Sequence, residues 1–456
     1  TVSIGFSRKH AAFQNSLRAY TVSSRLTNLT GFSSANARVF DISRPDDPKL
    51  LSNIAFQLQG SNYGATIPAS RAMSIIAVEN SAIFTPVSIT PNDGILLGDP
   101  SHNAELIIIA YKDFMAEAQN WANYRAGQGI NVEVVNVDEI FNEFGYGVLS
   151  SDSIEAFLNY AYNNWGTPST RPKYVLLIGD ASYDSRSYLS FGFFNYVPTR
   201  IVSTTFTETG SDESLADFDD DGLAEMAVGR IRARTPAQVA NALSKTVNWE
   251  GPGHLGTDPL ARGALFSSQV NSNEDFVGMS NQLKAELPIG TPTTMVTGAQ
   301  VFPNPDTAPL LAAMNTGNYL VNFSGHGSTG SWASTYFDNA SVSLLTNHNN
   351  ESLFTMLTCL NGYFLNPNVG QSSLAENLLN WNNGGAVAVW SSTGLTITDD
   401  QMPMGLKFYE LAGQENPRRL GDLIKEAKAE VQFGPDVRLS WALLGDPMLL
   451  MVEPSP

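Results

Sequence analysis

Residues 105–137 have the sequence ELIIIAYKDFMAEAQNWANYRAGQGINVEVVNV, and their pattern recurs along most of the chain. A continuous apolar run over 105–110 is typical of a parallel strand that is buried on both faces. A helical pattern over 113–128 ends at glycines, and a second strand pattern covers 131–137. This strand–helix–strand order predicts a parallel sheet with helices packed on its two faces.

The same alternation continues beyond this stretch. The sequence predicts strands over 173–179 and 225–231, and helices over 151–165 and 235–249 with Ser151 and Thr235 as N-caps. A glycine-containing segment at 251–256 predicts a hinge. After it, the sequence predicts strands over 264–266, 294–296, 318–323, 353–358 and 385–390, and helices over 274–286, 307–315, 374–380, 402–411 and 420–432. We therefore expect two α/β subdomains, at 99–250 and 251–456.

Residues 1–98 follow a different pattern. Short apolar stretches at 38–42, 51–58 and 74–78 alternate with turn signals, and no helical period persists through them. This pattern predicts a small β-sandwich-like domain. The turn-forming segment 91–94, PNDG, marks the expected exit from it.

The composition of the chain excludes several classes of protein. Its 456 residues include 44 acidic and 26 basic side chains, and the net charge of −18 argues against binding to nucleic acid. The single cysteine excludes an intrachain disulfide and a multi-cysteine zinc site. No apolar run approaches the roughly 20 residues that a membrane-spanning helix needs, so we expect no membrane span. The length corresponds to about three domains or subdomains of ordinary size.

The single cysteine and one histidine follow predicted buried strands. Cys359 comes directly after 353–358, and His326 follows 318–323 between two glycines. Ligands of open parallel sheets gather at the carboxyl ends of the strands. An imidazole beside a thiol favours the thiolate, which is the reactive form of a cysteine nucleophile. A lone cysteine is more often a small buried side chain, but the coincidence of these two residues at strand ends favours a catalytic pair.

The segments around these two residues resemble the motifs of the gingipain-type cysteine peptidases, family C25. The histidine motif is 322–328, NFSGHGS, with Trp332 shortly after it, and the cysteine motif is 358–364, TCLNGYF. Three other segments agree with the family, namely 175–180, VLLIGD, then 226–231, MAVGRI, and 444–447, LGDP. The resemblance covers about 99–453. The N-terminal stretch, which contains the segment 40–45, FDISRP, is similar to the β domain that precedes the peptidase unit in type IX sortase-like relatives.

This resemblance implies a caspase-like α/β fold of two subdomains, with the histidine and the cysteine in the second, preceded here by the small β domain. It implies the activity of a secreted cysteine endopeptidase. It also implies a third catalytic residue, a glutamate before the Gly-Arg motif, which is Glu225 in this chain. Glu225 would orient the imidazole and stabilise its cationic form.

General chemistry then predicts the reaction. His326 accepts the proton of Cys359 and later protonates the leaving amine, while Cys359 attacks the scissile carbonyl and forms a thioester. The backbone N–H groups of Cys359 and Gly327 are the candidates for the oxyanion hole. If an amine replaces water in the second step, the enzyme is a sortase-like transpeptidase that processes C-terminal secretion signals. The alternative from another class is a non-catalytic surface-binding or adhesin module, which would more readily have lost His326 or Cys359.

The resemblance also locates the substrate pocket. In this fold the strand and loop after the cysteine line the S1 pocket, which here predicts substrate contacts for Trp390, Ser391, Ser392 and Thr393. Because these side chains are uncharged, we do not expect the strict basic specificity of the gingipains. An acidic pocket would need Asp399, Asp400 or a residue from another loop.

An acidic stretch at 217–222, DFDDDG, resembles the first half of an EF-hand-type loop. Asp217, Asp219 and Asp221 stand at alternate positions, so their carboxylates can converge on one calcium ion. Val228 stands where such a loop carries its last glutamate, and Glu225 falls earlier in the loop. Similar family members bind calcium, which supports a structural calcium ion, and a solvated acidic turn is the alternative. We expect no organic cofactor.

Charged residues make up 15% of the chain, below the usual value of about a quarter. Such a surface is common in secreted bacterial proteins. We therefore expect a secreted or cell-surface protein that acts on protein or peptide substrates, with no signal peptide visible in this chain. The resemblance to the sortase-like relatives implies a link to a type IX secretion system.

Overall fold

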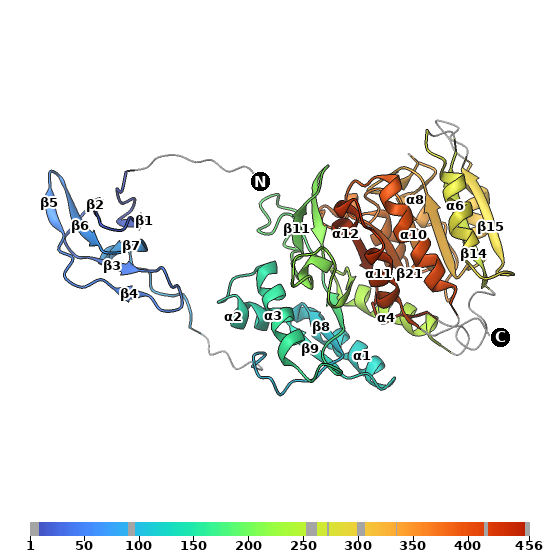
Figure 1. Ribbon diagram of the computed structural model, residues 1–456, viewed down its shortest axis with the longest axis horizontal. Helices are drawn as coiled ribbons and strands as arrows, with labels where there is room; N and C mark the ends of the chain where they lie inside the picture. Colours follow the sequence, from blue (N-terminus) through green and yellow to red (C-terminus); the bar gives the residue numbers. More distant parts are fainter. Residues whose placement is uncertain are drawn as a thin grey trace. The chain divides into compact units, whose positions relative to one another are not determined.

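The computed structural model describes residues 9–89, 96–251, 262–270, 273–298, 306–333, 335–414 and 418–451. The chain divides into two compact units, residues 1–92 and 93–456 (Figure 1). The predicted domain exit at 91–94, and all but the first residue of the predicted hinge at 251–256, lie outside the described residues.

The first unit contains two small antiparallel sheets. One has the strand order β1 (Ser16–Thr21), β7 (Met73–Glu79), β3 (Ala37–Asp41) and β4 (Lys49–Leu50), and the other has the order β2 (Arg25–Phe32), β6 (Asn62–Ala69) and β5 (Gln57–Gln59), with the short helix η1 (Asn80–Ala82) after β7. Buried side chains such as Phe32, Ile67 and Ile75 form one apolar core. Only the last two residues of the apolar stretch at 51–58 lie in a strand, β5, because Asn53 takes a left-handed φ of 61° that interrupts an extended chain before it.

The second unit is built on a ten-stranded sheet. Its strand order is β15 (Thr293–Gly298), β14 (Ala264–Gln269), β16 (Leu320–Ser324), β20 (Ser352–Leu357), β21 (Ala386–Ser392), β23 (Trp441–Leu444), β13 (Ala227–Ile231), β10 (Tyr174–Ile178), β8 (Leu106–Ala110) and β9 (Val132–Asn136). All neighbouring pairs in this sheet are parallel except β21 and β23, which are antiparallel. The predicted parallel sheet is therefore confirmed with one reversal: the strands from β15 to β21 run opposite to those from β23 to β9.

Helices cover both faces of this sheet, as predicted. On the half from β23 to β9, α2 (Val137–Phe144) and α3 (Ser151–Asn164) pack on one face, and α1 (Met115–Ala126) and α4 (Pro236–Trp249) pack on the other. On the other half, α6 (Phe276–Ala285), α10 (Thr398–Ala412) and α11 (Leu420–Ala429) cover one face (Figure 1). The opposite face is covered by α7 (Ala308–Met314), α8 (Asn339–Val342) and α9 (Leu374–Asn380). Within the described ranges, no helix combines the length and the apolar character that a bilayer crossing requires.

The helix ends test two capping predictions. Thr235 caps α4 through a capping box with Gln238, as predicted. The cap of α3 is Ser150, whose hydroxyl accepts the N–H of Asp152, so the prediction of Ser151 is wrong by one residue. The sequence prediction has no counterpart for the central strand β23, for the helices α2, α8 and α12 (Pro435–Ser440), or for the hairpin of β11 (Arg200–Ser203) and β12 (Glu208–Ser211). Shorter elements complete the unit: η2 (Lys112–Phe114), η3 (Glu213–Leu215), η5 (Val369–Gln371), β17 (Gly327–Ser328), β18 (Ser331–Trp332), β19 (Phe337–Asp338), β22 (Arg418–Arg419) and β24 (Leu450–Met451).

The reversal between β21 and β23 decides which strand ends share an edge of the sheet. Ser392 at the end of β21 pairs with Trp441 at the start of β23. The carboxyl ends of β16, β20 and β21 therefore lie at the same edge as the amino ends of β23 and β13. We call this the shared edge.

Candidate active site

His326 and Cys359 lie at the shared edge, beyond neighbouring strands. β16 and β20 pair with Ser324 opposite Leu357, and His326 and Cys359 each stand two positions past that pair. His326 is exposed and Cys359 is half-buried. The structure thus brings to one place the two residues that the sequence singles out.

Gly327 lies where the histidine loop touches the cysteine loop. A Cβ atom at Gly327 would be 2.3 Å from Thr358 Oγ1 and 2.8 Å from the carbonyl oxygen of Cys359. The N–H of Gly325 also donates to the carbonyl of Leu357, with 3.3 Å between N and O. A residue without a side chain is what lets the two loops approach this closely.

Two hydrogen bonds hold the backbone of His326. Its N–H donates to Gln269 Oε1 at 2.8 Å, and its carbonyl accepts the N–H of Ala333 at 2.8 Å. The imidazole packs edge-on against Phe276 of α6, with 5.2 Å between the ring centroids. Gln269 is buried at the end of β14, beside β16. The sequence did not point to Gln269, because the predicted strand ends at residue 266, short of the shared edge.

The sulfur of Cys359 faces the loop between β21 and α10. The N–H of Thr396 donates to Sγ at 3.4 Å, and the S–H donates to the carbonyl of Thr396 at 3.5 Å. Among the residues that the structure describes, the hydrogen-bond partners of this sulfur belong to Thr396. A threonine in a loop gives no signal in the sequence, so this contact depends on the folded loop.

The structure does not bring Glu225 to His326. Glu225 precedes β13, which lies four strands from β16 in the sheet order, a separation of about 19 Å at roughly 4.8 Å per strand. Its carboxylate instead accepts the N–H of Phe218 at 2.6 Å. The predicted role of Glu225 in orienting the imidazole therefore has no support in this geometry, although Glu225 does lie at the shared edge.

The four predicted substrate-binding residues are buried. Trp390 is 1% exposed and packs against Phe408 and Trp441 in the core. The Thr393 hydroxyl donates to the carbonyl of Gly210 at 2.8 Å, and Ser391 and Ser392 are fully enclosed. These side chains therefore stabilise the sheet and its hairpin rather than offering a surface to substrate, which corrects the prediction. The exposed apolar side chains of this segment come later, at Leu395 and Ile397.

The acidic loop gathers a different set of carboxylates from the predicted one. Oxygen atoms of Asp217, Asp219 and Glu225 lie within 4.8 Å of one another. Asp221 is outside this group, and its N–H donates to Asp217 at 3.1 Å. Burial raises the pKa of Asp217, so a cation beside it would offset the cost of desolvating its charge. Three carboxylates in reach of one point are a donor set that fits a hard cation such as calcium.

Arg230 lies in the half of the sheet from β23 to β9 and contacts the loop that follows Cys359. It is fully buried in β13, and its Nε and Nη2 donate to the two carboxylate oxygens of Asp212 at 2.7 and 2.6 Å. Its Nη1 donates to the carbonyls of Gly179 and Val197 at 2.7 and 2.9 Å. The guanidinium carbon lies 5.1 Å from the ring centroid of Phe364, which follows the cysteine.

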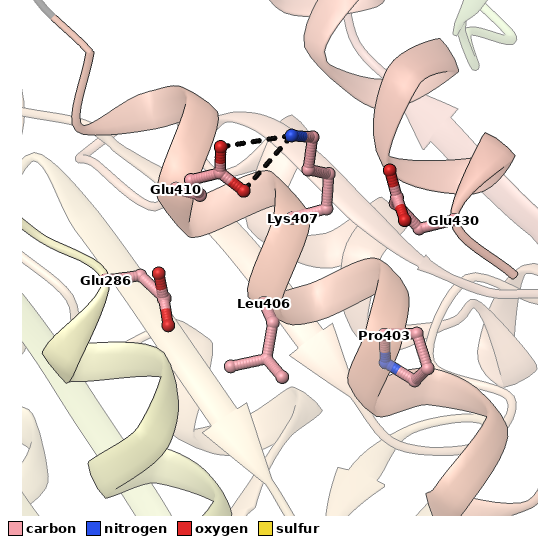
Figure 2. Close-up of a pocket in the computed structure, with 6 residues that line it drawn as sticks. All are labelled: Glu286, Pro403, Leu406, Lys407, Glu410 and Glu430. Carbon is pink, nitrogen blue, oxygen red and sulfur yellow. Dashed lines mark hydrogen bonds and ion pairs between the residues drawn. The ribbon is translucent and has the colours of Figure 1, made fainter.

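A pocket of about 330 Å³ lies elsewhere on the second unit (Figure 2). Its walls come from α10 and the ends of α6 and α11, and consist of Glu286, Pro403, Leu406, Lys407, Glu410 and Glu430. Lys407 Nζ donates to both carboxylate oxygens of Glu410, at 3.0 and 3.1 Å (Figure 2). Because neither His326 nor Cys359 lines it, we assign this pocket no catalytic role.

Residues 99–452 match the model of peptidase family C25. The chain belongs to this family. Gingipain R2 of Porphyromonas gingivalis is 21% identical over 371 residues, which cover 77% of this chain and 46% of that relative. Lys-gingipain HG66 of the same organism is 23% identical over 262 residues, which cover 58% of this chain and 14% of that relative. The C25 chain described here thus spans less than half the length of these curated relatives.

Solved structures share the fold of this chain. The crystal structure of the Arg-specific cysteine proteinase gingipain R gives a TM-score of 0.64 at 20% identity and covers 80% of both chains. The structure of dimeric latent PorU from Porphyromonas gingivalis gives a TM-score of 0.52 at 19% identity and covers 94% of this chain and 38% of PorU. The resemblance to C25 peptidases and the caspase-like α/β fold are therefore confirmed.

Proposed function

We propose that this C25 peptidase is a cysteine endopeptidase with Cys359 as the nucleophile and His326 as the general base. The observation that supports this most strongly is the position of the two residues beyond β16 and β20, in loops that touch at Gly327. Membership of peptidase family C25 supports peptide bonds as the bonds that the enzyme cleaves. The substrates would be proteins or peptides.

The proposed reaction has two steps. In the first, the imidazole of His326 takes the proton from Sγ, and the sulfur forms a bond to the scissile carbonyl carbon. The N–H groups of Cys359 and Gly327 are proposed to donate to the oxyanion that develops. The C–N bond then breaks, and His326 protonates the leaving amine. In the second step, His326 takes a proton from water while the water oxygen attacks the thioester carbonyl. The C–S bond then breaks, the carboxylic acid product leaves, and His326 returns the proton to the sulfur.

A peptide library that varies the residue before the cleaved bond tests this proposal. We expect cleavage that requires Cys359, and a covalent peptidyl–enzyme whose mass corresponds to a thioester. If folded protein cleaves no member of the library and forms no such adduct, the proposal is wrong and a non-catalytic binding module is favoured instead.

Gly327→Ala is expected to lower kcat/KM about 100-fold, because a displacement of about 1 Å at a reacting group costs about that much. The added Cβ atom would meet Thr358 and the carbonyl of Cys359, and would push the two loops apart. Gly370→Ala is the matched control, since its Cβ atom would meet only Asn368 Oδ1, at 3.4 Å. Steady-state kinetics check this, and equal kcat/KM values for the two variants would contradict it.

A second candidate function is transfer of the acyl group to an amine, as in a sortase-like transpeptidase that processes C-terminal secretion signals. It is supported by the likeness to PorU, which extends over 94% of this chain, against 80% for gingipain R. Incubating the enzyme with a peptide that it cleaves, in the presence of added amines, distinguishes hydrolysis from transfer. If only hydrolysed product forms at any amine concentration, the transfer reaction should be dropped.

We further propose that Asp217, Asp219 and Glu225 hold a structural calcium ion. Their carboxylate oxygens are close enough to share one ion, and Asp217 is already fixed by the N–H groups of Asp221 and Gly222 at 3.1 and 2.9 Å. Bound calcium would anchor the loop that leads into β13. It would supply no step of the peptidase reaction.

Calcium at millimolar concentration is expected to raise Tm by about 2–4 °C, because a ligand that binds only the folded state stabilises it. Asp217→Asn is expected to remove most of this response. Asp220→Asn, in the same loop but outside the carboxylate group, is expected to keep it. Calorimetry with calcium and with a chelator checks this, and an equal response of both variants would exclude the proposed ligand set.

We propose a secreted or cell-surface location linked to a type IX secretion system. The low share of charged residues, 15%, and the likeness to PorU support this. Fractionation of the native organism, with detection of the protein in the medium and on the cell surface, tests the location.

A further inference from the structure

Thr396 presents two hydrogen-bond donors to the sulfur of Cys359. Its N–H donates to Sγ at 3.4 Å, and its hydroxyl oxygen lies 3.9 Å from Sγ. A hydrogen bond to the charged form of a group stabilises that form and so favours ionisation. For a thiol, which ionises to an anion, both donors therefore favour the ionised sulfur.

Gln401 fixes the direction of the Thr396 hydroxyl. Gln401 lies in the first turn of α10 and is 3% exposed, and its Nε2 donates to Thr396 Oγ1 at 2.8 Å. A hydroxyl carries one hydrogen and two lone pairs. Because the oxygen already accepts a hydrogen from Gln401, the hydrogen of Thr396 itself remains available to the sulfur.

We propose that Thr396 stabilises the ionised sulfur of Cys359 through its N–H and its hydroxyl, and that Gln401 is a positioning residue that turns the hydroxyl toward the sulfur. This inference rests on the proposed role of Cys359 as the nucleophile. In the resting thiol, the S–H donates to the carbonyl of Thr396 at 3.5 Å. After the proton has moved to His326, the two donors of Thr396 hold the negative charge until the sulfur attacks.

Charged and titratable groups also stand on the elements around this loop. They are His326 after β16, Asp399 and Asp400 in α10, and Asp436 in α12. An imidazolium favours the ionised sulfur, and carboxylates oppose it. None of the substitutions below changes these groups, so differences between the variants report on Thr396 and Gln401.

The rate of alkylation of Cys359 by iodoacetamide, measured across pH, tests the proposal because only the thiolate reacts. Thr396→Val removes the hydroxyl and keeps the backbone N–H. We expect it to raise the pH midpoint of alkylation by about one unit and to slow alkylation at low pH about tenfold, since one unit corresponds to a factor of ten. Thr396→Ser restores the hydroxyl and is expected to give the wild-type profile.

Gln401→Met tests the positioning role. We expect it to give part of the shift seen in Thr396→Val, and to give no further shift when both substitutions are combined, because Gln401 acts through the hydroxyl. If the two substitutions instead acted on the sulfur independently of each other, their shifts would add in the double variant. Thr398→Val, the same substitution two positions further along, is the matched control and is expected to leave the profile unchanged. Thermal unfolding of each variant shows that it is folded.

Two results would overturn the proposal. One is a Thr396→Val profile equal to that of the wild type, and the other is a full additive shift in the double variant. Both results leave the proposed peptidase function standing, because that function depends on Cys359 and His326. If the wild type alkylates only as an ordinary thiol and cleaves no peptide, the proposed function fails, and this inference fails with it.

Discussion

Cys359→Ala is expected to lower kcat for peptide hydrolysis by about four to six orders of magnitude, because the covalent step loses its nucleophile. His326→Ala is expected to cost nearly as much. The double variant should lose little more than either single variant, since a nucleophile and its base act as a unit. Steady-state kinetics with a cleaved library peptide, and mass spectrometry of the acyl-enzyme, check this.

His348→Ala is the matched control for the histidine substitution. His348 lies before β20, at the end of that strand opposite Cys359, and its Nδ1 lies 3.4 Å from Glu351 Oε1. We expect wild-type kcat from this variant. Hydrolysis that survives in Cys359→Ala, or that depends on His348 as strongly as on His326, would contradict the assignment of the pair.

Arg230→Met is expected to lower the free energy of unfolding by about 3–5 kcal/mol, the usual cost of removing one partner of a buried ion pair. The substitution leaves the carboxylate of Asp212 and the carbonyls of Gly179 and Val197 buried without the donors they now have. It also removes the contact with Phe364 in the cysteine loop. Urea unfolding followed by circular dichroism measures the loss.

Two further variants test this explanation. Arg186→Met removes an exposed arginine whose Nη1 bonds to Tyr188 at 3.4 Å, and should change stability by less than about 0.5 kcal/mol. Combining Arg230→Met with Asp212→Leu should recover part of the loss, because the second change removes the uncompensated charge. If Arg230→Met and Arg186→Met are equally stable, the buried ion pair of Arg230 with Asp212 does not stabilise this fold.

Local patterns in the sequence predict most elements of the second unit. Runs such as 105–110 and 353–358 are apolar because parallel strands are buried on both faces, and they correspond to β8 and β20. The same patterns place His326 and Cys359 at the ends of strands. The two residues lie at the same edge of the sheet because β16 and β20 are neighbouring parallel strands.

What local patterns leave open is the order of strands across the whole sheet. Glu225 stands at the start of β13, and its distance from His326 depends on the antiparallel pairing of β21 with β23. No periodicity in the sequence encodes that pairing. Trp390 is a similar case, because its core position depends on helices α10 and α11 packing over β21. Thr396 and Gln269 meet the site through loop and strand-end geometry, which exists only in the folded chain.

The central claim is that His326 activates the thiol of Cys359, and alkylation by iodoacetamide in the wild type and in His326→Ala measures this most directly. Near neutral pH we expect rapid labelling of the wild type and labelling slower by at least about tenfold in the variant, because an unassisted thiol is mostly protonated there. The difference should narrow above about pH 9, where any exposed thiol ionises. Slow labelling of Cys359 at equal rates in both proteins would contradict the claim.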